Sequence, residues 1–274
     1  MRYSYYPGCT LKTQAGASLE RPALQAARAL GIDLVEQEEW QCCGAVFPLA
    51  TDEIAPFLAA VRSLATARDR GEKLVTLCAA CHHVLKRTNH LLQVGSETRD
   101  KTNNYLQLEQ PYTGEGQVIH YLELLRDELG FDRVAQKVTH PLAGRRIAPY
   151  YGCLLLRPAK IMAFDNAEDP RVMEDLLLSL GAEPVDYPYR TECCGVYLSV
   201  NNEEIAGSMV RKIVHAALKQ GAEAMVNACP LCHYNLLNLQ EKTPGGEPLL
   251  PVYYFTELLV TALGLPEEVG DKTR

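Results

Sequence analysis

Residues 42–44 read Cys-Cys-Gly and residues 78–81 read Cys-Ala-Ala-Cys. The same two motifs return 151 residues further on, as Cys-Cys-Gly at 193–195 and Cys-Pro-Leu-Cys at 229–232. A pattern that recurs in the same order at a fixed distance indicates an internal duplication. We therefore expect a protein of two similar halves, each built around one copy of these motifs.

Each half alternates short β-rich runs with longer helical segments, which is typical of an α/β fold. The expected strands of the first half are 3–6, 33–36, 73–77 and 117–121, and its expected helices are 18–30, 52–70, 80–92 and 122–129. The expected elements of the second half are strands 146–151, 184–187 and 224–228, helices 171–180, 203–220 and 231–239, and a last strand and helix within 251–263. The prediction is two similar Rossmann-like α/β units with small parallel sheets, related by internal duplication.

The first unit is expected to span residues 1–139 and the second residues 140–274, with the boundary in the segment 136–144. The polar segment 95–116 is interpreted as an excursion inside the first unit. A length of 274 residues accommodates one large domain or two domains of ordinary size.

Composition excludes several classes of protein. Hydrophobic residues make up 47% of the chain and charged residues 22%, which is typical of a globular protein and excludes a disordered or low-complexity chain. The net charge of −7 and the absence of a long basic run argue against nucleic-acid binding. No apolar run approaches the roughly 20 residues of a membrane span, and the N-terminus lacks a secretory signal, so we expect a cytoplasmic protein without a membrane span.

Ten cysteines are too many for an ordinary cytoplasmic chain, in which thiols stay reduced, so metal binding or redox chemistry is expected rather than disulfide scaffolding. One further cysteine precedes each copy of the motifs, Cys9 in the first and Cys153 in the second. Four cysteines follow predicted strands directly and should meet at the carboxyl edge of each sheet, where α/β folds bind their ligands. Gly44 and Gly195 provide the backbone freedom that two adjacent cysteines need to face one centre.

Each half thus supplies five cysteines to one site, one more than a structural zinc site or a cubane 4Fe-4S cluster uses. The fifth cysteine is a redox-active thiol, a cysteine that binds no metal, or a ligand of an iron-sulfur cluster that has more protein ligands than a cubane cluster. The first set is Cys9, Cys42, Cys43, Cys78 and Cys81, and the second set is Cys153, Cys193, Cys194, Cys229 and Cys232.

This duplicated pattern resembles the cysteine-rich CCG motif of the B-subunit family of heterodisulfide reductases, and the resemblance covers nearly the whole chain. It implies that each set holds one non-cubane 4Fe-4S cluster and that the two clusters face a cavity where a disulfide or thiol-type acceptor reacts. It also implies two partners, an electron-donating, ferredoxin-like iron-sulfur protein (the C subunit) and a flavin-binding protein (the A subunit). The chain has no Gly-x-Gly-x-x-Gly after a strand, so any flavin is expected on a partner.

One residue departs from the family pattern. Methanogen members that reduce a mixed disulfide place a His after the first cysteine of the second motif, where it suits proton delivery, and this chain has Leu154 there. The leading prediction is therefore an oxidoreductase subunit that splits an S–S bond in two one-electron steps. The alternative is a non-catalytic relay that joins two redox modules of a larger complex.

Other interpretations of the same residues stay open. Two structural zinc sites would use four thiols per half, and purely structural cysteines are a further alternative. The Cys-x-x-Cys-His patterns that end at His82 and His233 also match c-type haem attachment, which would leave six cysteines unexplained. These two histidines are the candidates for proton transfer, although packing near a cluster explains them as well.

Several charged residues near the cysteine motifs allow both a functional and a purely structural interpretation. Lys12, Arg157 and Arg190 lie close in sequence to cysteines and are candidates for binding an acidic substrate or balancing cluster charge, or are solvated cations. Glu123 and Glu257, paired by the repeat, begin predicted helices and are expected to interact with the helix N-terminus.

Overall fold

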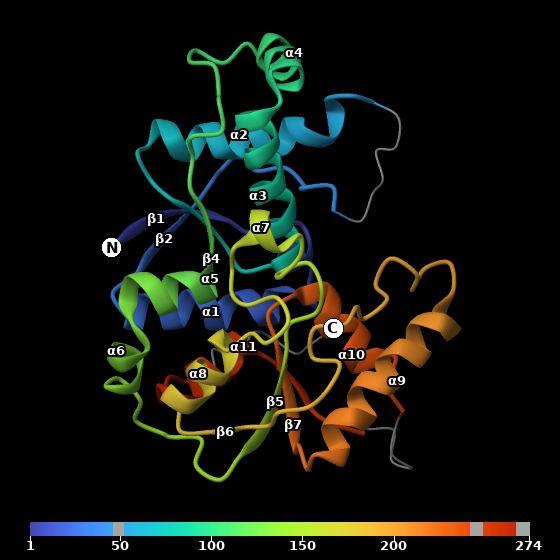
Figure 1. The fold of residues 1–274 in the computed structure, drawn as a ribbon. Helices are drawn as coiled ribbons and strands as arrows, with labels where there is room; N and C mark the ends of the chain where they lie inside the picture. The colour runs from blue at the N-terminus through green and yellow to red at the C-terminus, as the bar shows by residue number, and fades with distance from the viewer. Residues whose placement is uncertain (46–51, 242–248, 267–274) are drawn as a thin grey trace.

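The computed structural model describes residues 1–45, 52–241 and 249–266. Two separate four-stranded parallel sheets form the centre of the protein (Figure 1). The strand order is β2-β1-β3-β4 in the first sheet and β6-β5-β7-β8 in the second, which is the same order with the same all-parallel pairing. The predicted α/β fold of two similar duplicated units is confirmed.

The first sheet and its helices come from the N-terminal half. Its strands are β1 (Arg2–Tyr6), β2 (Asp33–Glu36), β3 (Leu74–Thr76) and β4 (Val118–His120). Its helical segments are η1 (Thr10–Lys12), α1 (Ala17–Ala29), α2 (Ala55–Asp69), α3 (Ala79–Val94), α4 (Ser96–Leu106), α5 (Tyr121–Glu123), the π-helix η2 (Leu124–Leu129) and α6 (Phe131–Ala135).

The second sheet repeats this plan in the C-terminal half. Its strands are β5 (Arg146–Tyr150), β6 (Glu183–Pro184), β7 (Ala224–Asn227) and β8 (Val252–Tyr254). Its helices are α7 (Ala159–Met162), α8 (Val172–Ser179), α9 (Glu203–Lys219), α10 (Pro230–Asn238) and α11 (Phe255–Ala262).

Three local features differ from the expectations. Strand β6 has two residues instead of the expected 184–187, and it is an edge strand in which Pro184 lacks the N–H that a longer ladder needs. The polar segment 95–116 contains helix α4, which has a single fully buried side chain, Thr102, and so shows little apolar pattern. The helix expected over 122–129 is mainly π-helical from Leu124.

The two halves pack against each other in a symmetric way. Helix α1 contacts α11 of the other half, and α5 likewise contacts α8 (Figure 1). Alanines at 23, 26 and 27 form much of the buried face of α1, and their small size allows close approach. Helix α1 ends before Gly31, which has a φ of +75°, so the chain turns back into β2 as the sequence predicts.

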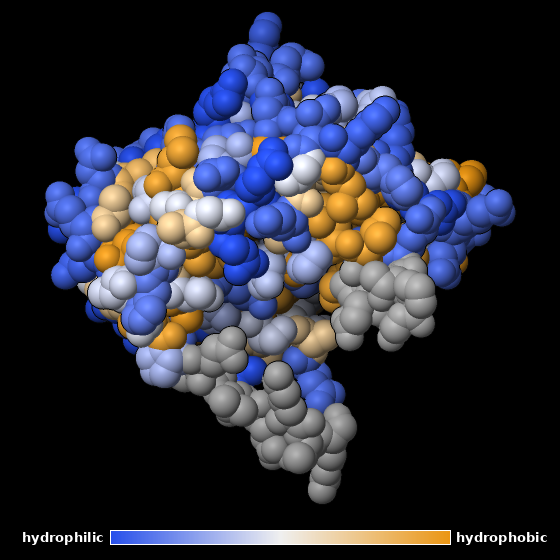
Figure 2. All heavy atoms as spheres, turned by 90° about the horizontal axis from the view of Figure 1, so that it is seen from below, coloured by the Kyte–Doolittle hydropathy of each residue, from blue (hydrophilic) through white to orange (hydrophobic). Residues whose placement is uncertain are grey.

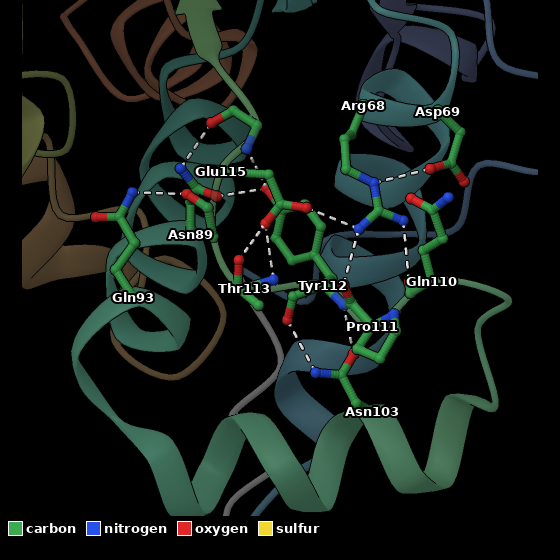
Figure 3. Close-up of polar contacts among 12 residues, drawn as sticks. Arg68, Asp69, Asn89, Gln93, Asn103, Gln110, Pro111, Tyr112, Thr113 and Glu115 are labelled. Atoms are coloured by element: carbon green, nitrogen blue, oxygen red, sulfur yellow. Dashed lines mark hydrogen bonds and ion pairs between the residues drawn. The ribbon is translucent and has the colours of Figure 1, made fainter.

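A polar network attaches the segment after α4 to the helices above the first sheet (Figure 3). Arg68 of α2 donates to the carbonyl oxygens of Gln110 and Pro111 and pairs with Glu115 at 2.7 Å. The Tyr112 ring lies under the Arg68 guanidinium, 5.4 Å from its centroid. These contacts explain how a polar segment without a strand of its own remains fixed.

The described surface is mostly hydrophilic on the face in Figure 2, with separate hydrophobic patches. No helix in the described ranges is long and apolar enough to cross a membrane. Several of the exposed large apolar side chains follow the second Cys-Cys-Gly motif, namely Tyr197, Leu198 and Val200.

Candidate metal centre

The first cysteine set gathers at the carboxyl ends of β1 and β3. Cys9 follows β1, and Cys78 is the N-cap of α3 directly after β3. The Cys42 and Cys9 sulfurs are 3.4 Å apart, and those of Cys43 and Cys81 are 3.5 Å apart. All five predicted thiols of this set therefore lie at one edge of the first sheet.

The second set repeats this arrangement after β5 and β7. Cys229 is the N-cap of α10, and the Cys194 and Cys232 sulfurs are 3.3 Å apart. Cys193 accepts a hydrogen bond from the Gly195 N–H at 3.3 Å, just as Cys42 accepts one from the Gly44 N–H at 3.5 Å.

Both Cys-Cys-Gly turns have the predicted backbone. Gly44 has a φ of +80° and Gly195 a φ of +76°, values that side chains other than glycine rarely adopt. The turn brings two adjacent cysteines to one site, although successive side chains of an extended segment point to opposite faces.

The two sets meet at the middle of the molecule. The Ala79 N–H donates to the Ala228 carbonyl at 3.2 Å, so the backbone of the first Cys-x-x-Cys motif is bonded to the residue directly before the second motif. Cys78 and Cys229 are themselves within hydrogen-bonding reach of each other. The ten thiols therefore form one continuous region between the sheets, as expected from the duplication.

The most exposed thiols belong to the first set. Cys9 and Cys42 are exposed, whereas Cys153, Cys193 and Cys232 of the second set are only partly exposed. Tyr197, 47% exposed, lies near thiols of both sets, since burial and the proximity of Cys153, Cys229 and Cys43 raise its pKa to about 12. No sequence pattern selects this tyrosine, because it has no counterpart in the first Cys-Cys-Gly turn.

Thiols packed this closely cannot all ionise by themselves. The hydrogen bond between Cys43 and Cys81 holds the pKa of Cys43 below its ordinary value, while the same bond, a bond with Cys78 and burial raise the pKa of Cys81. A hydrogen bond from Cys232 lowers the pKa of Cys229 in the same way. Full deprotonation needs a cationic partner, which is the role of a metal centre.

The donor set fits an iron-sulfur cluster on chemical grounds, because thiolates are the ligands of such clusters. Within residues 1–45, 52–241 and 249–266, no group of three or more His, Cys, Asp or Glu side chains has the spacing to hold a single metal ion. The sulfurs lie instead in contact pairs, with five cysteines at each sheet.

The two candidate histidines lie in different surroundings. His82 is fully buried, with Nε2 3.3 Å from a Glu123 carboxylate oxygen and neither ring nitrogen hydrogen bonded, and burial lowers its pKa strongly. His233 is largely buried, its Nδ1 is 3.2 Å from the Asn227 amide nitrogen, and burial lowers its pKa to about 4. The repeat thus preserves the residue type without preserving its contacts.

The two glutamates paired by the repeat act at helix N-termini, as expected. Glu123 accepts from the His120 N–H at 2.7 Å, and Glu257 accepts from the Tyr254 N–H at 2.6 Å. Both glutamates close a capping box.

The three candidate cations are engaged within the protein. Lys12 pairs with Glu20 at 2.9 Å, and Arg157 pairs with Glu168 at 3.1 Å. Arg190 pairs with three carboxylates, those of Asp169, Glu174 and Asp186. These ion pairs explain the three side chains without an acidic substrate.

Leu154, the residue that departs from the family pattern, lies beside a histidine from the other half. Its carbonyl oxygen is 3.1 Å from His83 Nδ1, and the Nε2 of that ring faces Arg87 at 3.3 Å. An imidazole is therefore present near this position, although it comes from α3 rather than from the second motif.

A polar groove of about 670 Å³ lies next to the first set without reaching its sulfurs. Trp40 and Gln41, the two residues before Cys42, form one wall, and Arg62 and Thr66 of α2 form part of the other. The chemistry of the cysteine region does not extend into this groove, because no cysteine lines it.

Comparison with known proteins agrees with this geometry. The CCG cysteine-rich domain matches the chain twice, at residues 3–86 and 147–237. The protein therefore consists of two similar cysteine-rich α/β units. The chain belongs to the CCG cysteine-rich domain family, which includes the B subunits of heterodisulfide reductases.

Two relatives are similar over nearly their whole length. The 8-methylmenaquinol:fumarate reductase membrane anchor subunit of Wolinella succinogenes is 32% identical over 98% of this chain and 94% of that protein. The B subunit of the ferredoxin/F(420)H(2)-dependent CoB-CoM heterodisulfide reductase of Methanosarcina acetivorans is 30% identical over 98% of this chain and 92% of that protein.

A solved structure shares the fold. A hypothetical protein from Helicobacter pylori superposes with a TM-score of 0.71 at 12% identity, covering 97% of this chain. The chain spans 49% of the length of that protein. Because the sequence identity is so low, the likeness concerns the fold alone.

Proposed function

We propose that this chain is an iron-sulfur subunit of a heterodisulfide reductase-like complex and that it carries two non-cubane 4Fe-4S clusters. One cluster is held by the first cysteine set and the other by the second. The proposal is supported chiefly by the convergence of five thiols at the carboxyl edge of each of two sheets, with a backbone hydrogen bond between Ala79 and Ala228 beside the two Cys-x-x-Cys motifs.

The proposed reaction is the reduction of a disulfide or thiol-type acceptor in the region between the two sets. Reduction of one S–S bond consumes two electrons and two protons and yields two thiols. The clusters supply electrons one at a time. The protein orients the acceptor, and the exposed Cys9 and Cys42 mark the side from which it reaches the cysteine region.

The proposed electron donor is a ferredoxin-like iron-sulfur protein, the C subunit of such a complex, and the flavin-binding A subunit is a further partner. Support comes from the resemblance of the motifs and from the name of the M. acetivorans relative, which refers to ferredoxin. We further propose a division into units 1–139 and 140–274, since the first sheet ends at His120 and the second begins at Arg146.

A second candidate is a relay subunit that passes electrons between redox modules without reducing a substrate itself. Leu154 favours this candidate, because an aliphatic side chain cannot deliver a proton at the position where disulfide-reducing relatives are expected to have a histidine. The W. succinogenes relative is named as part of a fumarate reductase rather than of a disulfide reductase, which supports the same view.

Turnover separates the two candidates. The anaerobically reconstituted chain, given an artificial one-electron reductant and a disulfide, should release two thiols per disulfide consumed if it is a reductase. Oxidation of the reductant only when a second electron acceptor protein is added, with no thiol released, would identify a relay.

A further inference from the structure

Two buried tyrosines occupy equivalent places in the two halves. Tyr6 ends β1 and Tyr150 ends β5, each three residues before the first cysteine of its set, and neither side chain is exposed. A phenol hydroxyl is protonated at neutral pH and can donate one hydrogen bond to a carbonyl.

Both hydroxyls make the same hydrogen bond. The Tyr6 hydroxyl donates to the carbonyl oxygen of Gln41, and the Tyr150 hydroxyl donates to that of Glu192 at 2.7 Å. Gln41 directly precedes Cys42, and Glu192 directly precedes Cys193. Gln41 and Glu192 have different side chains, but in both halves the acceptor is the backbone carbonyl. The two halves therefore share this hydrogen bond.

We propose that Tyr6 and Tyr150 are positioning residues that fix the Cys-Cys-Gly turns, so that both adjacent thiols of each turn face one cluster. A turn that points two neighbouring side chains to one site needs a fixed backbone on both sides. The glycine N–H bonds to the first cysteine sulfur on one side of the turn. The tyrosine hydroxyl holds the carbonyl on the other side.

The two turns are not equally supported. In the second half the buried Asn235 amide also donates to the Cys194 carbonyl at 2.9 Å. The repeat places Val84 at the equivalent position of the first half, and a valine side chain cannot donate. Among the residues that the structure describes, the first turn therefore depends more on Tyr6 than the second depends on Tyr150.

The matched variants are Tyr6→Phe, Tyr150→Phe and, as control, Tyr5→Phe. Each keeps the buried ring and removes one hydroxyl. The Tyr5 hydroxyl donates to Glu20 at 2.9 Å and makes no bond to a Cys-Cys-Gly segment, so the control reports the cost of losing a buried hydroxyl in the same strand.

Hydrogen exchange by mass spectrometry tests the positioning role with or without iron. Tyr6→Phe should speed amide exchange of residues 40–45 by about 2- to 10-fold, the factor that one ordinary hydrogen bond provides. Tyr150→Phe should speed exchange of residues 191–196 by less, and Tyr5→Phe should change neither segment. Equal exchange in Tyr6→Phe and Tyr5→Phe would overturn the proposal.

The consequence for the clusters rests on the proposed function and is measured separately. In the holoprotein, Tyr6→Phe should change the electron paramagnetic resonance signal of one cluster and hasten iron loss to a chelator, leaving the other signal unaltered. If the wild type contains no iron, the proposal that it holds iron-sulfur clusters is wrong. The hydrogen-exchange rates of residues 40–45 would still decide whether Tyr6 fixes the turn. Iron bound normally with unchanged signals and chelation rates in Tyr6→Phe would refute the effect of the tyrosine on the cluster.

Discussion

Gly8 and Gly152 offer a matched test of how closely each set is packed. Both precede the first cysteine of a set and have positive φ values, +74° and +66°. A Cβ at Gly8 would lie 2.6 Å from the Cys81 sulfur, whereas a Cβ at Gly152 would lie 3.4 Å from the Cys232 sulfur. Gly8→Ala and Gly152→Ala therefore share a backbone penalty but differ in their effect on a thiol.

The backbone penalty is about 1–2 kcal/mol for a non-glycine residue in the left-handed region. At about 2–4 °C per kcal/mol, both metal-free variants should melt roughly 2–8 °C below the wild type. At Gly8 the separation is about 1 Å short of ordinary contact, so the Cys81 sulfur has to move. At Gly152 the contact is nearly ordinary.

The assay is iron per chain after anaerobic reconstitution, followed by thermal unfolding of the metal-free chains. Gly8→Ala should hold about 4 Fe and Gly152→Ala about 8 Fe, the contents of one and two 4Fe-4S clusters. Equal iron in the two variants would show that the close approach of Gly8 to Cys81 does not govern cluster binding.

Three further predictions concern single side chains. Leu154→His should raise any disulfide reductase activity by up to about 10²- to 10⁴-fold, the range for a general acid, without changing iron content, and an unchanged rate would remove this residue as the discriminator. Burial acts to raise the pKa of Glu115, but hydrogen bonds from Arg68 and from the Thr113 side chain and backbone hold this pKa at about 2. The ionised Glu115 therefore stabilises the fold above pH 4.5, and this stabilisation is lost as the pH falls through about 2. Arg68→Gln should move this pKa toward 4.5 in an NMR titration, and a value that stays near 2 would contradict the role of the ion pair. Thr76→Val should lower the melting temperature of the metal-free chain by about 2–6 °C, because the buried Cys78 N–H loses the Thr76 hydroxyl, its acceptor at 3.3 Å. An unchanged melting temperature would show that water replaces this bond.

Much of the fold is predictable because the duplication shows in the sequence. Strand 33–36 has the predicted bounds, and the helix expected over 203–220 is observed as Glu203–Lys219. Strong periodicity and flanking glycines determine such elements locally. The short β6 and the π-helix are not predictable in this way, because edge pairing and tertiary packing decide them.

The positions of the cysteines are predictable from the sequence, and the contacts around them are not. The spacing of the cysteines and the strand-end rule place the thiols at the sheet edges, where they lie. The roles of Tyr6 and Tyr150 escape sequence reasoning, since strand tyrosines are most simply interpreted as core residues. Their alignment three residues before Cys9 and Cys153 is the one signal that could have revealed them. The engagement of Arg190 by three carboxylates depends on loops that no local pattern determines.

In the proposed function, each five-cysteine set holds one iron-sulfur cluster. The direct measurement is iron, acid-labile sulfide and zinc per chain in the anaerobically purified wild type and in two double variants, Cys78→Ala/Cys81→Ala and Cys229→Ala/Cys232→Ala. We expect about 8 Fe with matching sulfide in the wild type and about 4 Fe in each variant, with broad visible absorption. Stoichiometric zinc without iron, a sharp Soret band, or about 8 Fe retained in either variant would contradict this expectation.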